Sequence, residues 1–202
     1  MTPNPNPQTL ADLLSHAEHY AEFNLRYRAS LPGALFLLTP KGPALFVARS
    51  LADEDAKTDF AANARLLSVA HGATAAVIAL EAWAVLAAPG APIDPNQPPS
   101  LSPGRLDVVA LMGEAPGIHQ VRFLPILRDA AQAFTGFGEP NVIHGDHTKG
   151  IFARILPPRP PTLAEQARAQ AILQTTGIVA TMPAAERPKA RSASRPRHRF
   201  SC

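Results

Sequence analysis

The sequence predicts a two-layer α+β protein, in which a mainly antiparallel sheet of about five to seven strands carries an N-terminal, a middle and a C-terminal helix. Two observations predict this class. Segments whose apolar residues have helical spacing occur along the chain together with short apolar runs that flank turn sequences. The connections within each pair of runs are short, which favours antiparallel neighbours over the long crossovers of a parallel sheet.

The first helix is predicted to run from its N-cap, Thr9, to about Ala29. His16 and His19 lie three residues apart on its polar side, with Asp12 one turn before His16, and this arrangement favours a solvated face over a metal site. The opposite side carries residues at the 3, 4, 7 spacing that is typical of the buried side of a helix: Leu10, Leu13, Leu14, Ala17, Ala21, Asn24, Leu25 and Arg28.

A hairpin and a second helix are predicted next. Residues 34–39 and 44–48 are apolar runs that flank the turn sequence Pro-Lys-Gly-Pro. The helix begins near Asp53, whose carboxylate suits a helix N-terminus, and ends at Gly72. We expect His71, in its last turn, to cap the helix. The apolar side carries Ala56, Phe60, Ala64, Leu67 and His71.

The run 74–88 is ambiguous, because its alanines favour helix whereas Val77, Ile78, Trp83 and Val85 suit a buried strand. We expect a strand, followed by a proline-rich loop at 89–104.

Two further hairpins are expected after this loop. Residues 106–112 pair with 118–127, and residues 141–144 pair with 151–156. A last helix begins after Thr162, because Glu165 three residues later completes a capping box, and it ends at Gly177.

The chain is expected to form one domain over residues 9–177, with disordered ends at 1–8 and 178–202. The C-terminal segment is rich in proline, serine, alanine and arginine, and such a composition buries too little apolar surface to fold. The tail also holds most of the positive charge. Residues 187–202 contain six of the 19 basic residues and no acid, so residues 1–186 hold 13 basic against 16 acidic groups, a net charge of −3.

The composition excludes several classes of protein. Of 202 residues, 46% are apolar, which is enough for one core, and the single cysteine, Cys202, rules out an internal disulfide or a thiolate metal cluster. Residues 1–8 lack the basic leader and apolar core of a secretory signal. The most apolar run, 73–88, is shorter than a membrane span and contains Glu81. We therefore expect a cytoplasmic protein that does not enter a membrane.

The segment His144-Gly145-Asp146-His147 is the first candidate site. Two imidazoles and a carboxylate within four residues are ligands that hold zinc or another divalent metal, and a metal-bound water would serve hydrolysis. The spacings of JAB-type metalloproteases and of the HExxH helix are absent. The alternative is a hairpin turn with solvated histidines. A third ligand would have to come from His71, His119 or Glu114.

Glu81 is the second candidate. Apolar residues on both sides would bury it, and burial raises a carboxyl pKa toward the range useful for general acid or base catalysis. The alternative is a structural ion pair with Arg105 or Arg122. Trp83, two residues further on, could stack on a ligand, although a lone tryptophan in an apolar strand is more typical of a core.

The basic tail is the third candidate. Its flexible arginines would neutralise phosphates without reading bases, which is the chemistry of nonspecific nucleic-acid binding. The same charge would equally serve solubility or contact an acidic protein. The residues concerned include Arg191, Arg195, Arg197 and Arg199.

No phosphate-binding loop or nucleophile elbow occurs in the sequence, so it assigns no enzyme class. The leading hypothesis is a small cytoplasmic binding protein without a cofactor, which contacts a protein partner through its sheet or helix surface. A metal-dependent hydrolase at His144, Asp146 and His147, with zinc or another divalent metal, is the first alternative. A nucleic-acid accessory protein that acts through the tail is the second.

The segment Glu81-Ala82-Trp83, with the proline-rich linker and Arg105-Leu106-Asp107-Val108-Val109 after it, resembles a set of uncharacterised bacterial and prophage-encoded proteins. The resemblance covers about residues 50–115. It implies a compact α+β domain, and it implies no activity or site residue.

Overall fold

The computed structural model describes residues 6–85, 101–102, 104–145 and 150–175. It confirms the α+β class, with helices at the N-terminus, in the middle and toward the C-terminus. The elements in chain order are α1 (Leu10–Arg28), β1 (Ala34–Thr39), β2 (Gly42–Val47), α2 (Glu54–Ala70), β3 (Ala75–Ala84), β4 (Leu106–Ala115), β5 (Ile118–Arg128), β6 (Phe134–Phe137), β7 (Asn141–His144) and α3 (Leu163–Thr175).

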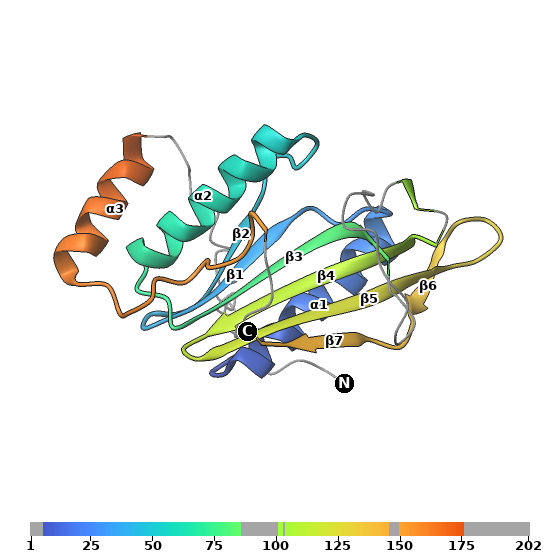
Figure 1. Cartoon of the computed structure of the whole chain (residues 1–202), viewed down its shortest axis with the longest axis horizontal. Helices are drawn as coiled ribbons and strands as arrows, with labels where there is room; N and C mark the ends of the chain where they lie inside the picture. The colour runs from blue at the N-terminus through green and yellow to red at the C-terminus, as the bar shows by residue number, and fades with distance from the viewer. Residues whose placement is uncertain (1–5, 86–100, 103, 146–149, 176–202) are drawn as a thin grey trace, which may run out of the picture.

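The strands form one antiparallel sheet in the order β2-β1-β3-β4-β5-β6 (Figure 1). The three longest strands, β3, β4 and β5, lie side by side at its centre. Strand β5 is long enough to pair with two short strands on the side away from β4. Its residues 120–123 pair with β7, and its residues 126–128 pair with β6. The run 74–88 is therefore a central strand, as expected, and not a helix.

Helices cover both faces of the sheet, so the fold has three layers where two were expected. The physical reason is that the central strands are apolar on both sides. Neighbouring residues such as Leu35 and Phe36 of β1 are both buried, but in different clusters. A strand that buries both of its faces needs cover on both. Helix α1 covers one face, which we call the α1 face, and α2 with α3 covers the other, the α2 face.

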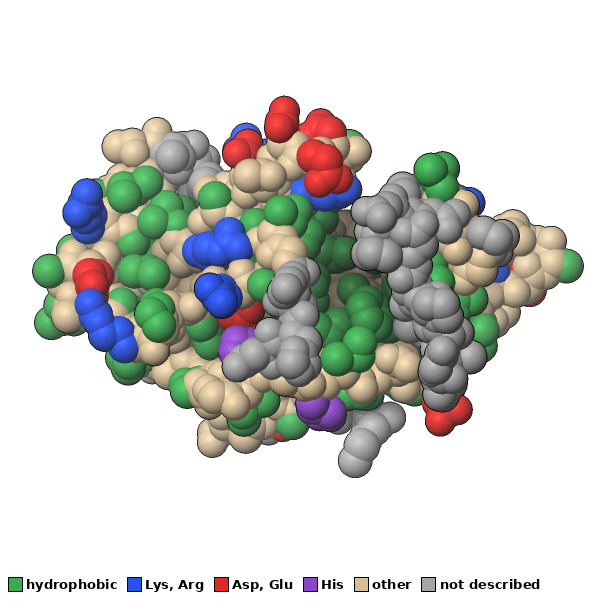
Figure 2. Space-filling view, in the orientation of Figure 1, with side chains coloured by type: hydrophobic (Ala, Val, Ile, Leu, Met, Phe, Trp, Pro, Cys, Tyr) green, Lys and Arg blue, Asp and Glu red, His purple; other side chains and the backbone are tan. Residues whose placement is uncertain are grey.

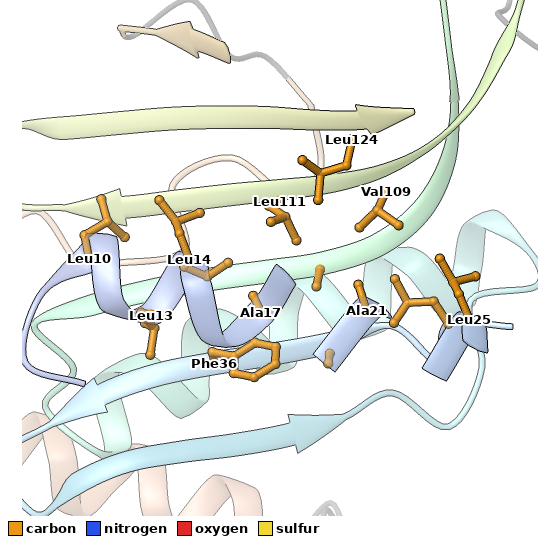
Figure 3. Close-up of a cluster of buried hydrophobic side chains, with 14 of the residues drawn as sticks. Leu10, Leu13, Leu14, Ala17, Ala21, Leu25, Phe36, Val109, Leu111 and Leu124 are labelled. Carbon is orange, nitrogen blue, oxygen red and sulfur yellow. The ribbon is translucent and has the colours of Figure 1, made fainter. Parts of the chain in front are cut away.

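The α1 face holds the first core cluster. Thr9 is the N-cap, as predicted, and forms a capping box with Asp12, and the apolar side of the helix then packs on β1, β3 and β4. Figure 3 shows the leucines of α1 directed at the strands. The backbone of β4 lies close to α1 at Gly113, where a Cβ atom would lie 3.1 Å from Leu10 Cδ1 and 3.3 Å from Leu14 Cδ2. Glycine is therefore the residue that lets α1 sit this close to β4.

The α2 face holds the second core cluster. Asp53 caps α2 as predicted, since its side chain accepts a hydrogen bond from the Ala56 N–H, and Phe60, Ala64 and Leu67 face the sheet. Helix α3 packs on α2, where the Gln170 side chain donates to the Ala70 carbonyl at 3.0 Å.

The predicted capping box of the last helix is present. The Glu165 N–H donates to the Thr162 hydroxyl, and the Thr162 N–H donates to the Glu165 carboxylate. Hydrogen bonds from Arg159 and Thr162 lower the pKa of Glu165 to about 2. The predicted end of this helix, Gly177, lies outside the described residues.

The second half of the chain departs from the prediction in two places. Residues 151–156 form no strand, and β7 pairs with β5 instead. The reason is that several backbone carbonyls of this segment accept hydrogen bonds from the Arg65 side chain, so they do not join a sheet ladder. Strand β6 was not predicted, because Phe134-Thr-Gly-Phe137 is only four residues long and contains a glycine.

None of the helices in the described part of the chain combines the length and the apolar character that crossing a membrane requires. The tail 178–202 and most of the loop 89–104 lie outside the described residues. The tail candidates Arg191, Arg195, Arg197 and Arg199 therefore remain predictions.

Candidate ligand-binding cavity

A cavity with a volume of about 870 Å³ opens on the α2 face. Its floor is the end of the sheet where β4 turns into β5. The segment 150–161 forms the opposite wall, which includes four prolines, and α2 contributes Arg65. Basic, acidic and histidine side chains gather below α2 in Figure 2. Apolar floor and wall residues are Met112, Val121, Phe152 and Leu156.

Glu114 and His119 form a pair on the floor. They are partners in the β4–β5 register, so their side chains project from the same face of the sheet. Glu114 is 7% exposed, which makes it one of three buried polar or charged residues in the described part of the chain. Its Oε2 accepts a hydrogen bond of 3.0 Å from the Leu156 N–H. A buried carboxylate is costly unless it has hydrogen-bond partners, and this bond also fixes the end of the 150–156 segment.

Arg65 fixes the same segment from the other side. Its Nη2 donates to the carbonyls of Ile151 and Ala153, and its Nε donates to that of Arg154 at 3.2 Å. Arg65 and Glu114 therefore hold the segment over the floor between them, one through its carbonyls and the other through an N–H.

The remaining arginines at the cavity differ in how they are bound. Both terminal nitrogens of Arg159 donate to Glu165, at 2.7 and 3.0 Å. Arg154 is exposed, lies in the left-handed region with φ of 58°, and has no hydrogen-bond or ion-pair partner for its guanidinium among the described residues. The cavity thus has a negative charge on its floor and an uncompensated positive charge at its edge.

His71 does not line this cavity. Its ring packs 5.4 Å from that of Phe46, and burial, with a smaller contribution from Lys41, lowers its pKa. His71 is the C-cap residue of α2, as expected, and its lowered pKa favours the neutral imidazole.

This lowered pKa makes a prediction about acid stability. The unfolded chain, in which the His71 pKa is near 6.5, binds a proton more readily than the folded chain does, so stability falls as the pH drops through about 6.5. In His71→Gln this part of the pH dependence is expected to disappear. Urea unfolding of the variant and of wild type at pH 8 and pH 5 measures the difference. His19→Gln, at an exposed histidine of α1, should lose as much stability between pH 8 and pH 5 as wild type does. If all three proteins lose the same stability between these pH values, the acid sensitivity does not come from His71.

The expectation that Glu81 is buried is wrong. The side chain is exposed, and its carboxylate accepts a hydrogen bond from the Leu31 N–H. The predicted arginine partners lie elsewhere: Arg105 is 5.2 Å from the centre of the Trp83 ring, and Arg122 is 3.9 Å from Glu18. The burial on which an acid or base role for Glu81 depended is therefore absent.

The core position expected of Trp83 is also wrong, because its side chain is 52% exposed. The residues of β3 are buried only where a helix layer covers the sheet. Beyond Leu80 the side chains of β3 that project toward the α1 face, those of Glu81 and Trp83, are exposed. The apolar character of the run 74–88 gave no sign of where that cover ends.

The predicted metal site is described only in part. His144 is exposed on β7 and pairs with Gln120, whose side chain projects from the α1 face, whereas His119 projects from the α2 face. Asp146 and His147 lie outside the described residues. Within the described part of the chain no three histidine, cysteine, aspartate or glutamate residues form a metal-binding group. The metal hypothesis stays a prediction, which elemental analysis of the purified protein would decide.

Sequence reasoning named Glu114 and His119 only as possible third metal ligands, and it did not foresee the cavity. The available signal was a single carboxylate at the end of an otherwise apolar strand, beside a hairpin turn. In comparisons with protein-family models, with curated proteins and with solved structures, the chain has no match.

Proposed function

We propose that this chain is a binding protein and that the cavity between the β4–β5 hairpin and the segment 150–161 is its ligand site. One observation carries the proposal: the buried carboxylate of Glu114 lies in the wall of a large, mostly apolar cavity, and its Oε1 has no partner among the described residues. Apolar walls with a few placed polar groups are typical of small-molecule sites, which have volumes of about 300–1,000 Å³.

The way the cavity is built also supports binding. Its wall contains Pro157, Pro158, Pro160 and Pro161, whose rings restrict the backbone. Arg65 and Glu114 hold the adjoining segment in place. A site whose walls are already ordered loses little entropy when a ligand enters, and this preorganisation raises affinity.

A second candidate function is the contact with a protein partner that the sequence suggested. Three aromatic side chains on the α1 side favour it: Trp83 is 52% exposed, Tyr27 is 70% exposed and Phe23 is 48% exposed. The guanidinium of Arg105 lies over the Trp83 ring. Aromatic residues and arginine are enriched in protein interfaces. We call Phe23, Tyr27 and Trp83 the α1-side aromatics.

One dye-binding experiment separates the two candidates. Nile red, an uncharged dye, fluoresces when it enters apolar surroundings, and we expect it to bind the folded protein saturably, with about one site per chain. Ala153 lines the cavity, so Ala153→Phe should fill part of it and weaken dye binding about fivefold or more. Ala62→Phe, at an exposed alanine of α2 that does not line the cavity, is the matched control and should bind like wild type.

The opposite pattern would overturn the cavity as the site. If Trp83→Ala abolishes dye binding while Ala153→Phe leaves it unchanged, the dye reports the α1-side aromatics, and the protein-contact function gains support. If folded wild-type protein binds no dye at all, the cavity is not a ligand site. A cooperative thermal transition in each variant excludes dye binding to partly unfolded chains.

A further inference from the structure

The distribution of charge around the cavity limits what kind of ligand it accepts. This inference rests on the proposed function, because it concerns the same cavity. The floor has one buried carboxylate, that of Glu114, with Oε2 used by the Leu156 N–H. Its Oε1 is an acceptor without a described donor. A ligand group that donates hydrogen bonds and carries positive charge, such as an ammonium, satisfies both the acceptor and the charge.

The edge of the cavity requires the opposite charge. Arg159 is neutralised by Glu165, but the guanidinium of Arg154 has no partner among the described residues. The hydrogen bonds of Arg65 use Nε and Nη2, which leaves Nη1 available. Planar guanidinium groups of this kind bind carboxylates through paired hydrogen bonds.

A ligand with a single charge would pair with one of these charged groups and be repelled by the other. A simple amine would pair with Glu114 but bring its charge near Arg154 and Arg65. A simple carboxylate would pair with the arginines but bring a second negative charge to a buried carboxylate, and a buried unpaired charge is strongly unfavourable. A compound with both charges pairs with both kinds of group, and the apolar residues Met112 and Phe152 accommodate its body.

The volume indicates the size of this compound. At about 870 Å³ the cavity lies near the upper end of the range for drug-sized ligands, and a single amino acid would leave most of it unfilled. Three extended residues span about 10 Å. We propose that the cavity binds a short apolar peptide with free ends, or a compound of the same chemistry, with its ammonium on Glu114 and its carboxylate on Arg154 and Arg65.

Three matched peptides test this proposal by titration calorimetry on the full chain. The probes are trileucine, N-acetyl-trileucine, which lacks the ammonium, and trileucine amide, which lacks the carboxylate. Trileucine should bind, and each blocked peptide should bind about tenfold or more weakly, because each leaves a charged group of the cavity unpaired.

Two conservative variants assign each charge to its partner. Glu114→Gln keeps an acceptor for the Leu156 N–H and should abolish the preference for a free ammonium. Arg154→Gln should weaken the preference for a free carboxylate, because Arg65 alone then remains to bind it, and should leave the ammonium preference intact. Arg49→Gln, at an exposed arginine outside this cavity, is the control and should keep both preferences.

The proposal and the function on which it rests fail in different ways. If the dye binds in the cavity but no peptide does, the ligand class is wrong and the cavity remains a binding site. If all three peptides bind equally, charge recognition at both ends is wrong. If only the ammonium matters, the role of Arg154 and Arg65 is overturned. If neither dye nor peptide binds, the proposed function itself fails.

Discussion

Leu14→Ala is expected to destabilise the folded protein by about 3 kcal/mol, the largest effect of any substitution considered for this chain. Leu14 is 0% exposed and lies in the middle of the apolar side of α1. Truncation removes the transfer free energy of the buried side chain and also leaves a cavity behind it. The cost of that cavity depends on how far the neighbouring atoms can move to fill it.

The neighbours of Leu14 have little freedom to fill this cavity. Gly113 of β4 faces Leu14 and has no side chain to move into the space, and its backbone belongs to the centre of the sheet. The cavity left by the substitution therefore stays open, and we expect a loss of stability in the middle of the range measured for buried leucines. Against a total stability of about 5–15 kcal/mol, this loss would lower the thermal midpoint by roughly 10 °C.

Phe23→Ala is the matched control for this prediction, because it truncates a larger side chain of the same helix at a position that is 48% exposed. We expect it to cost less than about 1 kcal/mol. Urea unfolding followed by circular dichroism measures both changes. If both variants lose the same free energy of unfolding, the buried side chain of Leu14 stabilises the fold no more than the exposed side chain of Phe23 does.

The first half of the fold follows from the sequence because local signals and burial agree there. The spacing of leucines and alanines in α1, its N-cap Thr9 and the N-cap Asp53 of α2 are local signals that the structure confirms. The run 74–88 was harder, because alanine favours helix. The pairing of β3 with β1 and β4 decides the conformation, and this long-range contribution is absent from any local pattern.

The second half was predicted less well for a related reason. The residues 151–156 are apolar except for Arg154 and follow a turn sequence, which is also the pattern of a strand. Their conformation is set by Arg65, which lies 86 positions earlier in the chain than Ile151. Likewise, Glu114 was visible as a carboxylate in an apolar strand, but its burial depends on the segment that passes over it. The cavity exists only where these distant parts meet, so no local sequence pattern predicts it.

Arg65→Ala is expected to cost about 2 kcal/mol and, more specifically, to release the segment that forms one wall of the cavity. The substitution removes three hydrogen bonds from a charged donor to the carbonyls of Ile151, Ala153 and Arg154. Because these carbonyls lie near the surface, water replaces part of what is lost, and the global cost stays below that of three separate charged hydrogen bonds. The local effect should be larger than the global one.

Hydrogen exchange measures this local effect. The Leu156 N–H, which donates to Glu114, should exchange much faster in Arg65→Ala than in wild type, while amides of β3 and β4 change only as far as global stability does. Arg65→Lys keeps the charge but not the planar set of donors, so it should give intermediate protection. Arg49→Ala, at an exposed arginine without a described partner, should leave both measurements at their wild-type values. Unchanged exchange at Leu156 in Arg65→Ala would mean that Glu114 alone holds the segment. The wall of the cavity, and with it the affinity for dye and peptide, would then depend on the carboxylate and not on the arginine.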